Sequence, residues 1–440
     1  MSRFRIALLS VIVAGIASFA IARPSTSADL SSEAAFRDAR SYTVRIRTRI
    51  ETPFLGEEQG AFQGAGFLVD ARRGWIVTNA HVVGESPSDI QIAFADGKYY
   101  PARKLYVDSF ADIAVISLDR PVTDHPAARL ERTAPPVVGE TIGAFGHPLG
   151  VPFTGTRGIV SGVTDQAGPD LIQIDATVDH GNSGGPVIAF RDGSVLGIAT
   201  YKSGRNERDR LNFATPIAGV RRILALLREG RSPSPPAIRF ALFKDDDGRY
   251  TMEVARTFDT NAWPFEPGDR IVSVQGHPGR IQRLEDLVTA LRGRTGPVAV
   301  TVERGDMPVN IVTHPTLRHS IIDRRGISID GALIAPLAFE DGAVLSDATP
   351  LIIHSVDPSS TAMTLDLQPL DMIHRVDGRA FESLDSLITY AQSRSGEPLR
   401  LEIRRLCEET YRLFEYHVRE LPGADVKLVG PPEKSPVASR

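Results

Sequence analysis

The chain has 440 residues, of which 42% are hydrophobic and 24% charged, and its formal net charge is -4. This composition is that of an ordinary globular protein, and the small negative charge excludes the broad attraction to phosphates on which nucleic-acid binding usually rests. The single cysteine, Cys407, excludes a disulfide framework and any zinc site built from several cysteines. At about 150 residues per domain, the length predicts roughly three domains.

The first 22 residues have the features of a secretory signal peptide. Arg3 and Arg5 provide positive charge, residues 6–21 are uncharged and apolar, and residues 20–22 read Ala-Ile-Ala, an A-x-A cleavage pattern. As a helix the apolar run would reach about 24 Å, which is short for a bilayer core about 30 Å thick. The sequence therefore predicts export with cleavage, and an uncleaved anchor in the inner membrane is the alternative. Because the exported chain has one cysteine, we expect a bacterial periplasm.

After an N-terminal extension (23–40), residues 41–228 consist of short apolar stretches broken by Gly, Pro and Asp. Two examples are Gly-Phe-Leu-Val at 66–69 and Ile-Ala-Val-Ile at 113–116. Many short strands at close spacing predict an all-β barrel or sandwich.

A linker rich in Pro and Ser (229–236) precedes two segments that resemble each other. Residues 267–276 match 369–378, and 284–288 match 384–388. The offset stays near 100 residues, so this is a tandem domain repeat and not a solenoid. The predicted repeats cover 237–318 and 319–422, and the polar, Pro-rich segment 423–440 is predicted to be disordered.

The most informative segment is Gly-Asn-Ser-Gly-Gly-Pro at 181–186. It satisfies G-x-S-x-G, the nucleophile elbow of α/β-hydrolases, but an elbow needs a helix directly after the serine. Gly184-Gly185-Pro186 opposes a helix. The strong partners, His81 and Asp112, also precede Ser183, and the order His, Asp, Ser is that of chymotrypsin.

These three residue types suit covalent catalysis. The hydroxyl of Ser183 is a weak nucleophile until an adjacent base such as His81 takes its proton. Asp112 would hold the imidazole in the required tautomer and stabilise its charged form. The backbone N–H groups of Gly181 and Ser183 would form an oxyanion hole.

Other residues compete for these roles. Four further acids could take the place of Asp112, namely Asp108, Asp119, Asp175 and Asp179. His147 and His180 are expected to be structural or loop residues. No H-E-x-x-H motif occurs, so we predict neither a metal site nor a cofactor.

The segments at 64–69, 77–83, 111–116, 181–186 and 211–216 closely resemble the HtrA/Deg family of exported serine proteases. This resemblance covers roughly residues 40–228, and the repeats resemble the PDZ domains of that family. It implies a mostly β fold, with a chymotrypsin-like double β-barrel followed by two PDZ-like α+β domains. It also implies an ATP-independent endopeptidase that cleaves unfolded or damaged proteins and assembles as trimers or multiples of trimers.

The resemblance also implies where substrates bind. Thr177, six residues before the serine, would lie at the base of the primary pocket, which argues against strict cleavage after Arg or Lys. Ile198, Ala199 and Thr200 would form part of its wall, with a preference for small or medium aliphatic side chains.

In the second repeat, the loop that takes a peptide C-terminus would be formed by Gly326, Ile327, Ser328 and Ile329. The first repeat has no comparable glycine, so its peptide binding stays open. The competing function is a non-catalytic chaperone or peptide-binding scaffold that retains the protease fold.

Overall fold

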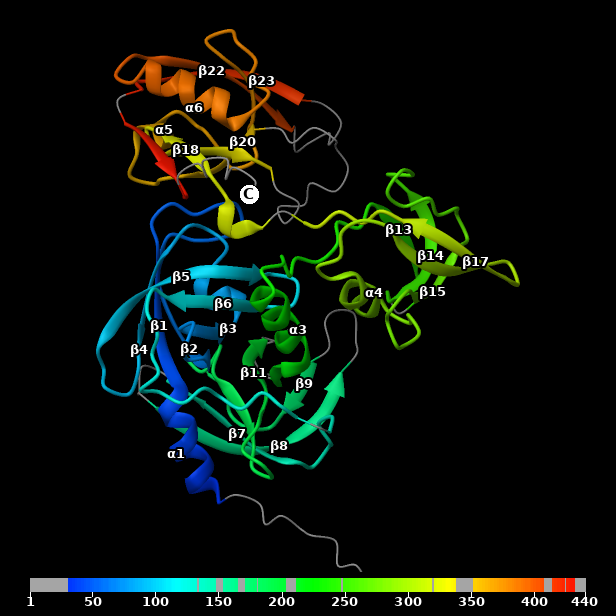
Figure 1. Cartoon of the computed structure of the whole chain (residues 1–440). Coiled ribbons are helices and arrows are strands. Elements are labelled where there is room, and N and C mark those ends of the chain that lie inside the picture. Colours follow the sequence, from blue (N-terminus) through cyan, green and yellow to red (C-terminus); the bar gives the residue numbers. More distant parts are fainter. Residues whose placement is uncertain are drawn as a thin grey trace, which may run out of the picture.

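The computed structural model describes residues 31–132, 134–147, 153–164, 171–179, 181–202, 211–246, 248–318, 320–337, 351–406, 414–423 and 425–431. The predicted signal peptide, His180 and Cys407 lie outside these residues. Within them, no helix combines the length and apolarity that crossing a bilayer requires. A double barrel occupies the lower part of Figure 1, with one further sheet beside it and another above it.

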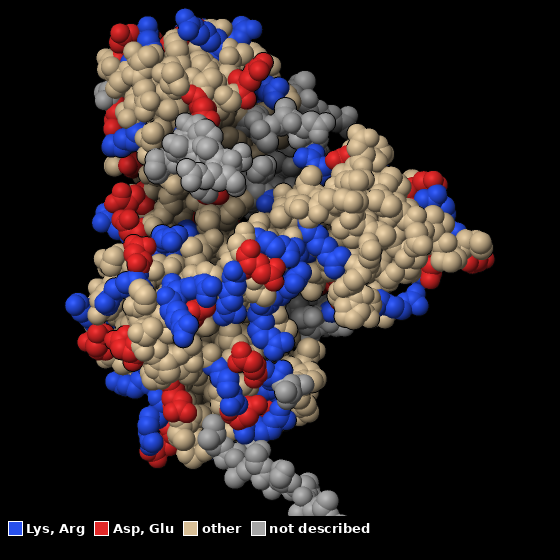
Figure 2. Space-filling model, in the orientation of Figure 1, with Lys and Arg blue, Asp and Glu red and all other residues tan. Residues whose placement is uncertain are grey.

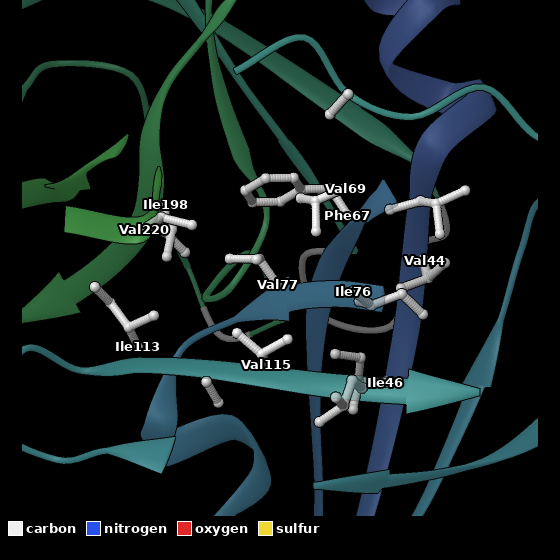
Figure 3. Packing of buried hydrophobic residues seen from close by; sticks show 14 of the residues in the cluster. Val44, Ile46, Phe67, Val69, Ile76, Val77, Ile113, Val115, Ile198 and Val220 are labelled. Atoms are coloured by element: carbon white, nitrogen blue, oxygen red, sulfur yellow. The ribbon is translucent and has the colours of Figure 1, made fainter. Parts of the chain in front are cut away.

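The first barrel is closed by six strands in the order β1-β2-β3-β6-β5-β4. Their bounds are β1 (Thr43–Ile50), β2 (Gly60–Asp70), β3 (Trp75–Thr78), β4 (Asp89–Ala93), β5 (Tyr99–Asp108) and β6 (Ile113–Leu118). Alternate residues such as Val44 and Ile46 point inward, and every residue of β6 is buried. Figure 3 shows these side chains meeting in one cluster.

The second barrel has the strand order β10-β11-β12-β9-β8-β7. Its strands are β7 (Thr141–Gly146), β8 (Thr154–Thr164), β9 (Leu171–Ile174), β10 (Pro186–Ala189), β11 (Val195–Lys202) and β12 (Leu211–Pro216). Helix α3 (Ile217–Arg228) follows, and its buried Val220 lies beside Ile198 in the core of Figure 3. The predicted double β-barrel is therefore confirmed.

Helix α1 (Ser32–Tyr42) covers part of the second barrel, in a segment for which the sequence predicted no element. The side chain of Ser31 caps the helix by accepting a hydrogen bond from the backbone N–H of Ala34. Phe36 packs against Phe145 and Phe190 at ring-centroid distances of 5.9 and 5.4 Å. These contacts make the helix part of the barrel domain.

Each repeat forms a sheet with a helix, as expected for PDZ-like domains. The first has β13 (Phe240–Lys244), β14 (Tyr250–Thr257), β15 (Arg270–Val274), α4 (Leu284–Leu291), β16 (Val298–Arg304) and β17 (Met307–Thr313). The second follows the 3-10 turn η2 (Ile321–Asp323). It has β18 (Gly326–Ile329), β19 (Ala332–Pro336), β20 (Leu351–Val356), α5 (Thr361–Thr364), β21 (Met372–Val376), α6 (Leu384–Ser393), β22 (Leu399–Leu406), β23 (Phe414–Leu421) and β24 (Val426–Val429).

Two sequence predictions, one about the second repeat and one about the C-terminal tail, are wrong. Residues 326–329 are not a loop but β18, which is paired with β19 on one side and with β24 on the other. The predicted disorder from residue 423 fails for Val426–Val429, because these residues complete the ladder of β18. The carboxylate of Asp330 holds the segment that leads into β24 by accepting hydrogen bonds from the backbone N–H groups of Gly423 at 2.6 Å and Asp425 at 2.9 Å.

Charges are mixed on the surface. On the face shown in Figure 2, basic side chains are more frequent over the double barrel than over the β13–β17 sheet, and acidic side chains lie among them. This interleaving agrees with the near-balance of the composition and gives this face no uninterrupted basic surface.

Candidate active site

The three predicted catalytic residues come from separate parts of the double barrel. His81 lies on the short helix α2 (Ala80–Val83) that follows β3, and Asp112 lies in the turn between β5 and β6. Ser183 lies in the loop before β10. The Nδ1 atom of His81 is 3.0 Å from each carboxylate oxygen of Asp112, and the His81 backbone N–H donates to Oδ1 at 3.2 Å. This geometry suits a carboxylate that orients an imidazole.

Asp112 is held in an unusual backbone conformation. Its φ of +52° is in the left-handed region, which costs a residue with a side chain about 1–2 kcal/mol. The side-chain amide of Asn79 donates to the Asp112 carbonyl at 2.9 Å, and the hydroxyl of Thr200 donates to Oδ2 at 2.9 Å. These two bonds help to hold the carboxylate in the orientation in which it faces His81.

The loop that carries Ser183 depends on glycines. Gly181 has a φ of +100° and Gly184 a φ of +89°. A Cβ atom on Gly184 would lie 2.1 Å from the carbonyl oxygen of Ala65, so no larger residue fits. The Ala65 N–H in turn donates to the Ser183 carbonyl at 2.9 Å, which ties the loop to β2.

His81 and Ser183 line the same cavity, whose volume is about 530 Å³. The other lining residues are Arg45, Ala61, Phe62, Gln63, Gly64, Val82, His147 and Gly181. The His81 side chain is half-exposed, whereas Ser183 is 8% exposed and is fixed by its loop. A substrate in this cavity would therefore meet the hydroxyl and the imidazole together.

The competing acids have other partners. Asp108 is buried and forms an ion pair with Arg292 at 2.6 Å, and Asp119 pairs with Arg103 at 3.2 Å. The carboxylate of Asp175 accepts a hydrogen bond from a backbone N–H of β8, and the Asp179 carbonyl accepts one from the backbone of residue 182. The imidazole of His81 is contacted by the carboxylate of Asp112, at 3.0 Å.

Ile198, Ala199 and Thr200 were predicted to form part of the substrate-pocket wall, but their side chains do not line the cavity. Ile198 and Ala199 are fully buried, one in the core of each barrel, because β11 lies between the two cores. Thr200 is also buried and donates to Asp112 instead of facing substrate. Thr177 is exposed, and its carbonyl accepts a hydrogen bond from the Asn182 side chain at 3.4 Å, so it lies next to the serine loop.

His147 contributes to the site in a way that the sequence did not reveal. Its backbone N–H donates to the carbonyl of Gly181 at 3.1 Å, and its Nδ1 accepts a hydrogen bond from the Phe153 N–H at 3.0 Å. The ring is 2% exposed, and burial lowers the pKa of His147 from 6.5 to about 4. The backbone of His147 therefore supports the predicted oxyanion residue Gly181, while its ring holds the backbone of Phe153.

Sequence reasoning also missed Asn79 and Thr200 as supports of Asp112. The role of Asn79 could have been suspected from the sequence, since Asn79 lies two residues before His81 in the same motif. Thr200 had none, because its contact crosses between the barrels. Within the described part of the chain, no group of three or more His, Cys, Asp or Glu residues could hold a metal ion.

Comparisons with known proteins agree with this geometry. Residues 64–198 match the family described as the trypsin-like peptidase domain. Serine protease HTRA1A of Danio rerio is 32% identical over 304 residues, which cover 62% of this chain and 61% of that protein. The probable periplasmic serine endoprotease DegP-like of Chlamydia pneumoniae is 26% identical over 373 residues, covering 79% and 74%. The chain spans between 38% and 61% of the length of the first four curated relatives it matches.

A solved structure shares the fold. The HtrA-type protease AlgW with a tripeptide has a TM-score of 0.53 and 23% sequence identity to this chain, with 66% of this chain and 98% of that chain covered. At this identity the likeness concerns the fold.

Proposed function

We propose that this chain, which has a trypsin-like peptidase domain and is a homologue of the HtrA and DegP serine proteases, is a serine endopeptidase. The observation that carries the proposal is the contact between His81 and Asp112 at the wall of the cavity that also contains Ser183. A structural histidine would have no need of a carboxylate at Nδ1 and of a glycine-held serine in the same cavity.

In the proposed mechanism, the Ser183 hydroxyl attacks the carbonyl carbon of the scissile peptide bond while Nε2 of His81 takes its proton. Asp112 accepts the hydrogen bond from Nδ1–H and stabilises the imidazolium. The tetrahedral oxyanion accepts hydrogen bonds from the backbone N–H groups of Gly181 and Ser183. When this intermediate collapses, the C–N bond breaks and the imidazolium gives its proton to the leaving amine.

The remaining acyl ester is then hydrolysed. A water molecule attacks the ester carbonyl, His81 takes its proton, and the Ser183 oxygen leaves with that proton. Each oxyanion donor is worth on the order of 3 kcal/mol of the barrier. Gly181 must therefore be held accurately, and the hydrogen bond from His147 to its carbonyl supports this orientation.

The finer parts of the proposal concern substrates and location. We infer that substrates are unfolded or damaged polypeptides, with small or medium aliphatic side chains placed over Thr177. Export through residues 1–22 would bring the chain to the periplasm, as the name of the Chlamydia relative describes for that protein. Association as trimers or multiples of trimers, and binding of peptide C-termini by the PDZ-like domains, are inferred from the family resemblance.

Casein hydrolysis by the Ser183→Ala variant tests the activity. We expect the rate to fall by roughly 10⁶-fold, because the nucleophile is lost. Ser109→Ala is a matched control, since Ser109 is exposed and does not line the cavity. Equal rates for wild type and Ser183→Ala would refute the peptidase. Suppression of aggregation by a chain that never hydrolyses casein would favour the alternative, a non-catalytic chaperone or scaffold.

A further inference from the structure

Three arginines alternate along β1. Arg45, Arg47 and Arg49 occupy every second position of the strand, and the side chains between them are buried in the first barrel. Arg45 is half-buried, whereas Arg47 and Arg49 are exposed. Of the three, Arg45 lines the cavity that also contains the proposed nucleophile. The strand therefore brings one positive charge to the candidate active site.

The strand register fixes the place of Arg45. It lies opposite Ala65 of β2, whose N–H donates to the Ser183 carbonyl at 2.9 Å. On its other side it lies opposite Ala93 of β4, which is itself opposite Tyr99 of β5. Because Ala93 is small, the Arg45 side chain reaches across it, and its Nη1 donates to the Tyr99 hydroxyl at 3.3 Å. This bond orients the guanidinium and leaves its charge intact, since the hydroxyl is neutral.

The charge of Arg45 is not balanced by an acid of the cavity wall. Among the described residues that line the cavity, none is Asp or Glu. Burial and, to a smaller extent, the charge of Arg45 lower the pKa of His147 to about 4, so that ring is neutral near pH 7. His81 must also be neutral to act as the base. A carboxylate that enters the cavity would therefore be attracted by Arg45.

The cavity lies on the leaving-group side of the scissile bond. In the proposed mechanism His81 gives its proton to the leaving amine, so the polypeptide after the scissile bond passes the imidazole. Residues 61–64 of β2 and Val82 form the wall beside it. Thr177, over which we place the side chain before the scissile bond, is not among the described residues of this wall. Side chains that enter the cavity therefore belong to residues after the scissile bond.

We propose that Arg45 is a specificity-determining residue, which favours substrates that carry Asp or Glu within three residues after the scissile bond. The limit follows from reach. Two strand spacings of about 4.8 Å separate Arg45 from the loop of Ser183, and three extended residues span about 10 Å. The inference rests on the proposed peptidase function and names the class of polypeptide that the same site prefers.

The preference should be moderate and sensitive to salt. Arg45 and His81 are both partly exposed, so water screens part of the attraction. We expect kcat/KM to be roughly three- to tenfold higher for an acidic peptide than for its neutral counterpart. The Debye length falls from about 10 Å at 0.1 M salt to about 3 Å at 1 M. The preference should therefore shrink over this range.

Internally quenched peptides of one parent sequence test the proposal with the full chain. The parent has Val before the scissile bond and Gln at the three following positions, and Glu or Lys replaces each Gln in turn. Mass spectrometry shows that the same bond is cleaved. Each enzyme is scored by its ratio of kcat/KM for the Glu peptide to that for the Gln peptide, so that a loss of activity common to both peptides cancels.

The variants separate charge from packing. Wild type should give a ratio of about three or more at one or more of the three positions. Arg45→Gln should bring that ratio close to one, Arg45→Lys should keep most of it, and Arg45→Glu should favour the Lys peptide instead. An Arg45→Gln chain that keeps the wild-type ratio overturns the proposal.

Arg47→Glu is the matched control. It changes the net charge as Arg45→Glu does, on the same strand, but the Arg47 guanidinium lies 4.2 Å from the centre of the Tyr99 ring, and Arg47 is not among the described residues that line the cavity. We expect this variant to keep the wild-type ratio. Equal effects of Arg45→Glu and Arg47→Glu would show that the overall charge of the strand acts on substrates, which contradicts a specific role of Arg45.

Failure of this inference differs from failure of the proposed function. If casein and the Gln peptide are cleaved but the ratio is close to one at all three positions, the peptidase stands and the role of Arg45 is overturned. If neither casein nor any of the peptides is hydrolysed, the proposed function fails, and this inference fails with it.

Discussion

The hydroxyl of Thr200, on β11 of the second barrel, donates a hydrogen bond of 2.9 Å to Oδ2 of Asp112 in the first barrel. The same carboxylate faces Nδ1 of His81. The orientation of the imidazole therefore depends on how the two barrels pack together.

Removing this hydroxyl should weaken catalysis without removing a reacting group. In Thr200→Val the shape is retained but Asp112 loses a hydrogen bond, and a bond to a charged group is worth about 1.5–3 kcal/mol. We expect kcat/KM for a peptide substrate to fall by roughly 10- to 100-fold. Thr200→Ser should restore most of the rate because it keeps the donor. Equal rates for the Val and Ser variants would show that Thr200 acts through packing alone.

The identity of the acid can be tested with isosteric amides. Asp112→Asn should lower kcat by about 10⁴-fold, because the amide would favour the wrong tautomer of His81. Asp119→Asn is the control, since the Asp119 side chain is 77% exposed and pairs with Arg103. A small effect of Asp112→Asn on casein hydrolysis would contradict the assignment of Asp112.

The glycine after the serine should tolerate no side chain. Gly184→Ala combines a positive φ with a clash against the Ala65 carbonyl, and we expect it to lower the free energy of unfolding by about 3 kcal/mol or more. Gly139 is a matched control with a φ of +87° and open space around it, so Gly139→Ala should cost only about 1–2 kcal/mol. Urea unfolding measures both, and equal losses would argue against the clash.

The first repeat is joined to the barrel by a buried ion pair. Arg292 Nη1 lies 2.6 Å from Oδ2 of Asp108 and 2.9 Å from the Tyr106 hydroxyl. Arg292→Met leaves the carboxylate buried without its partner and should cost about 3–5 kcal/mol of unfolding free energy. Adding Asp108→Asn should recover part of this loss, because a neutral amide is easier to bury. Arg103→Met, at an exposed pair, should change stability by less than about 1 kcal/mol.

The lowered pKa of His147 predicts how the free energy of unfolding depends on pH. Because burial lowers its pKa to about 4, the unfolded chain takes up a proton between pH 6.5 and 4 that the folded chain does not. The free energy of unfolding should therefore fall as the pH drops through this range, by up to about 3 kcal/mol from this group. His147→Asn keeps an acceptor near the position of Nδ1 and removes the titrating group. The free energy of unfolding of this variant, measured with urea, should therefore fall less steeply as the pH drops. An unchanged slope would show that other groups cause the decline.

What is local could be predicted from the sequence by itself. The glycines around Ser183 meet a backbone requirement within a few residues. Strand alternation predicted an all-β barrel or sandwich, and the resemblance of the motifs to the HtrA/Deg family implied the double barrel. Comparison of the chain with itself located the repeats. The order of His81, Asp112 and Ser183 also distinguished this arrangement from an α/β-hydrolase.

The tertiary structure decided which distant groups meet. Five acids were possible partners of His81, and only packing across the barrel placed Asp112 against it while Arg292 took Asp108. The sequences of β11 and β18 showed which of their residues are apolar, but they did not show which core would bury each of these side chains. The side chains of Ile198 and Ala199 are therefore buried in the two cores and do not face the substrate pocket. Residues Gly326–Ile329 are a strand and not the predicted loop. The physical reason is that a sequence encodes how much burial a residue prefers, whereas the partner strand is set by the summed packing of segments far apart in the chain.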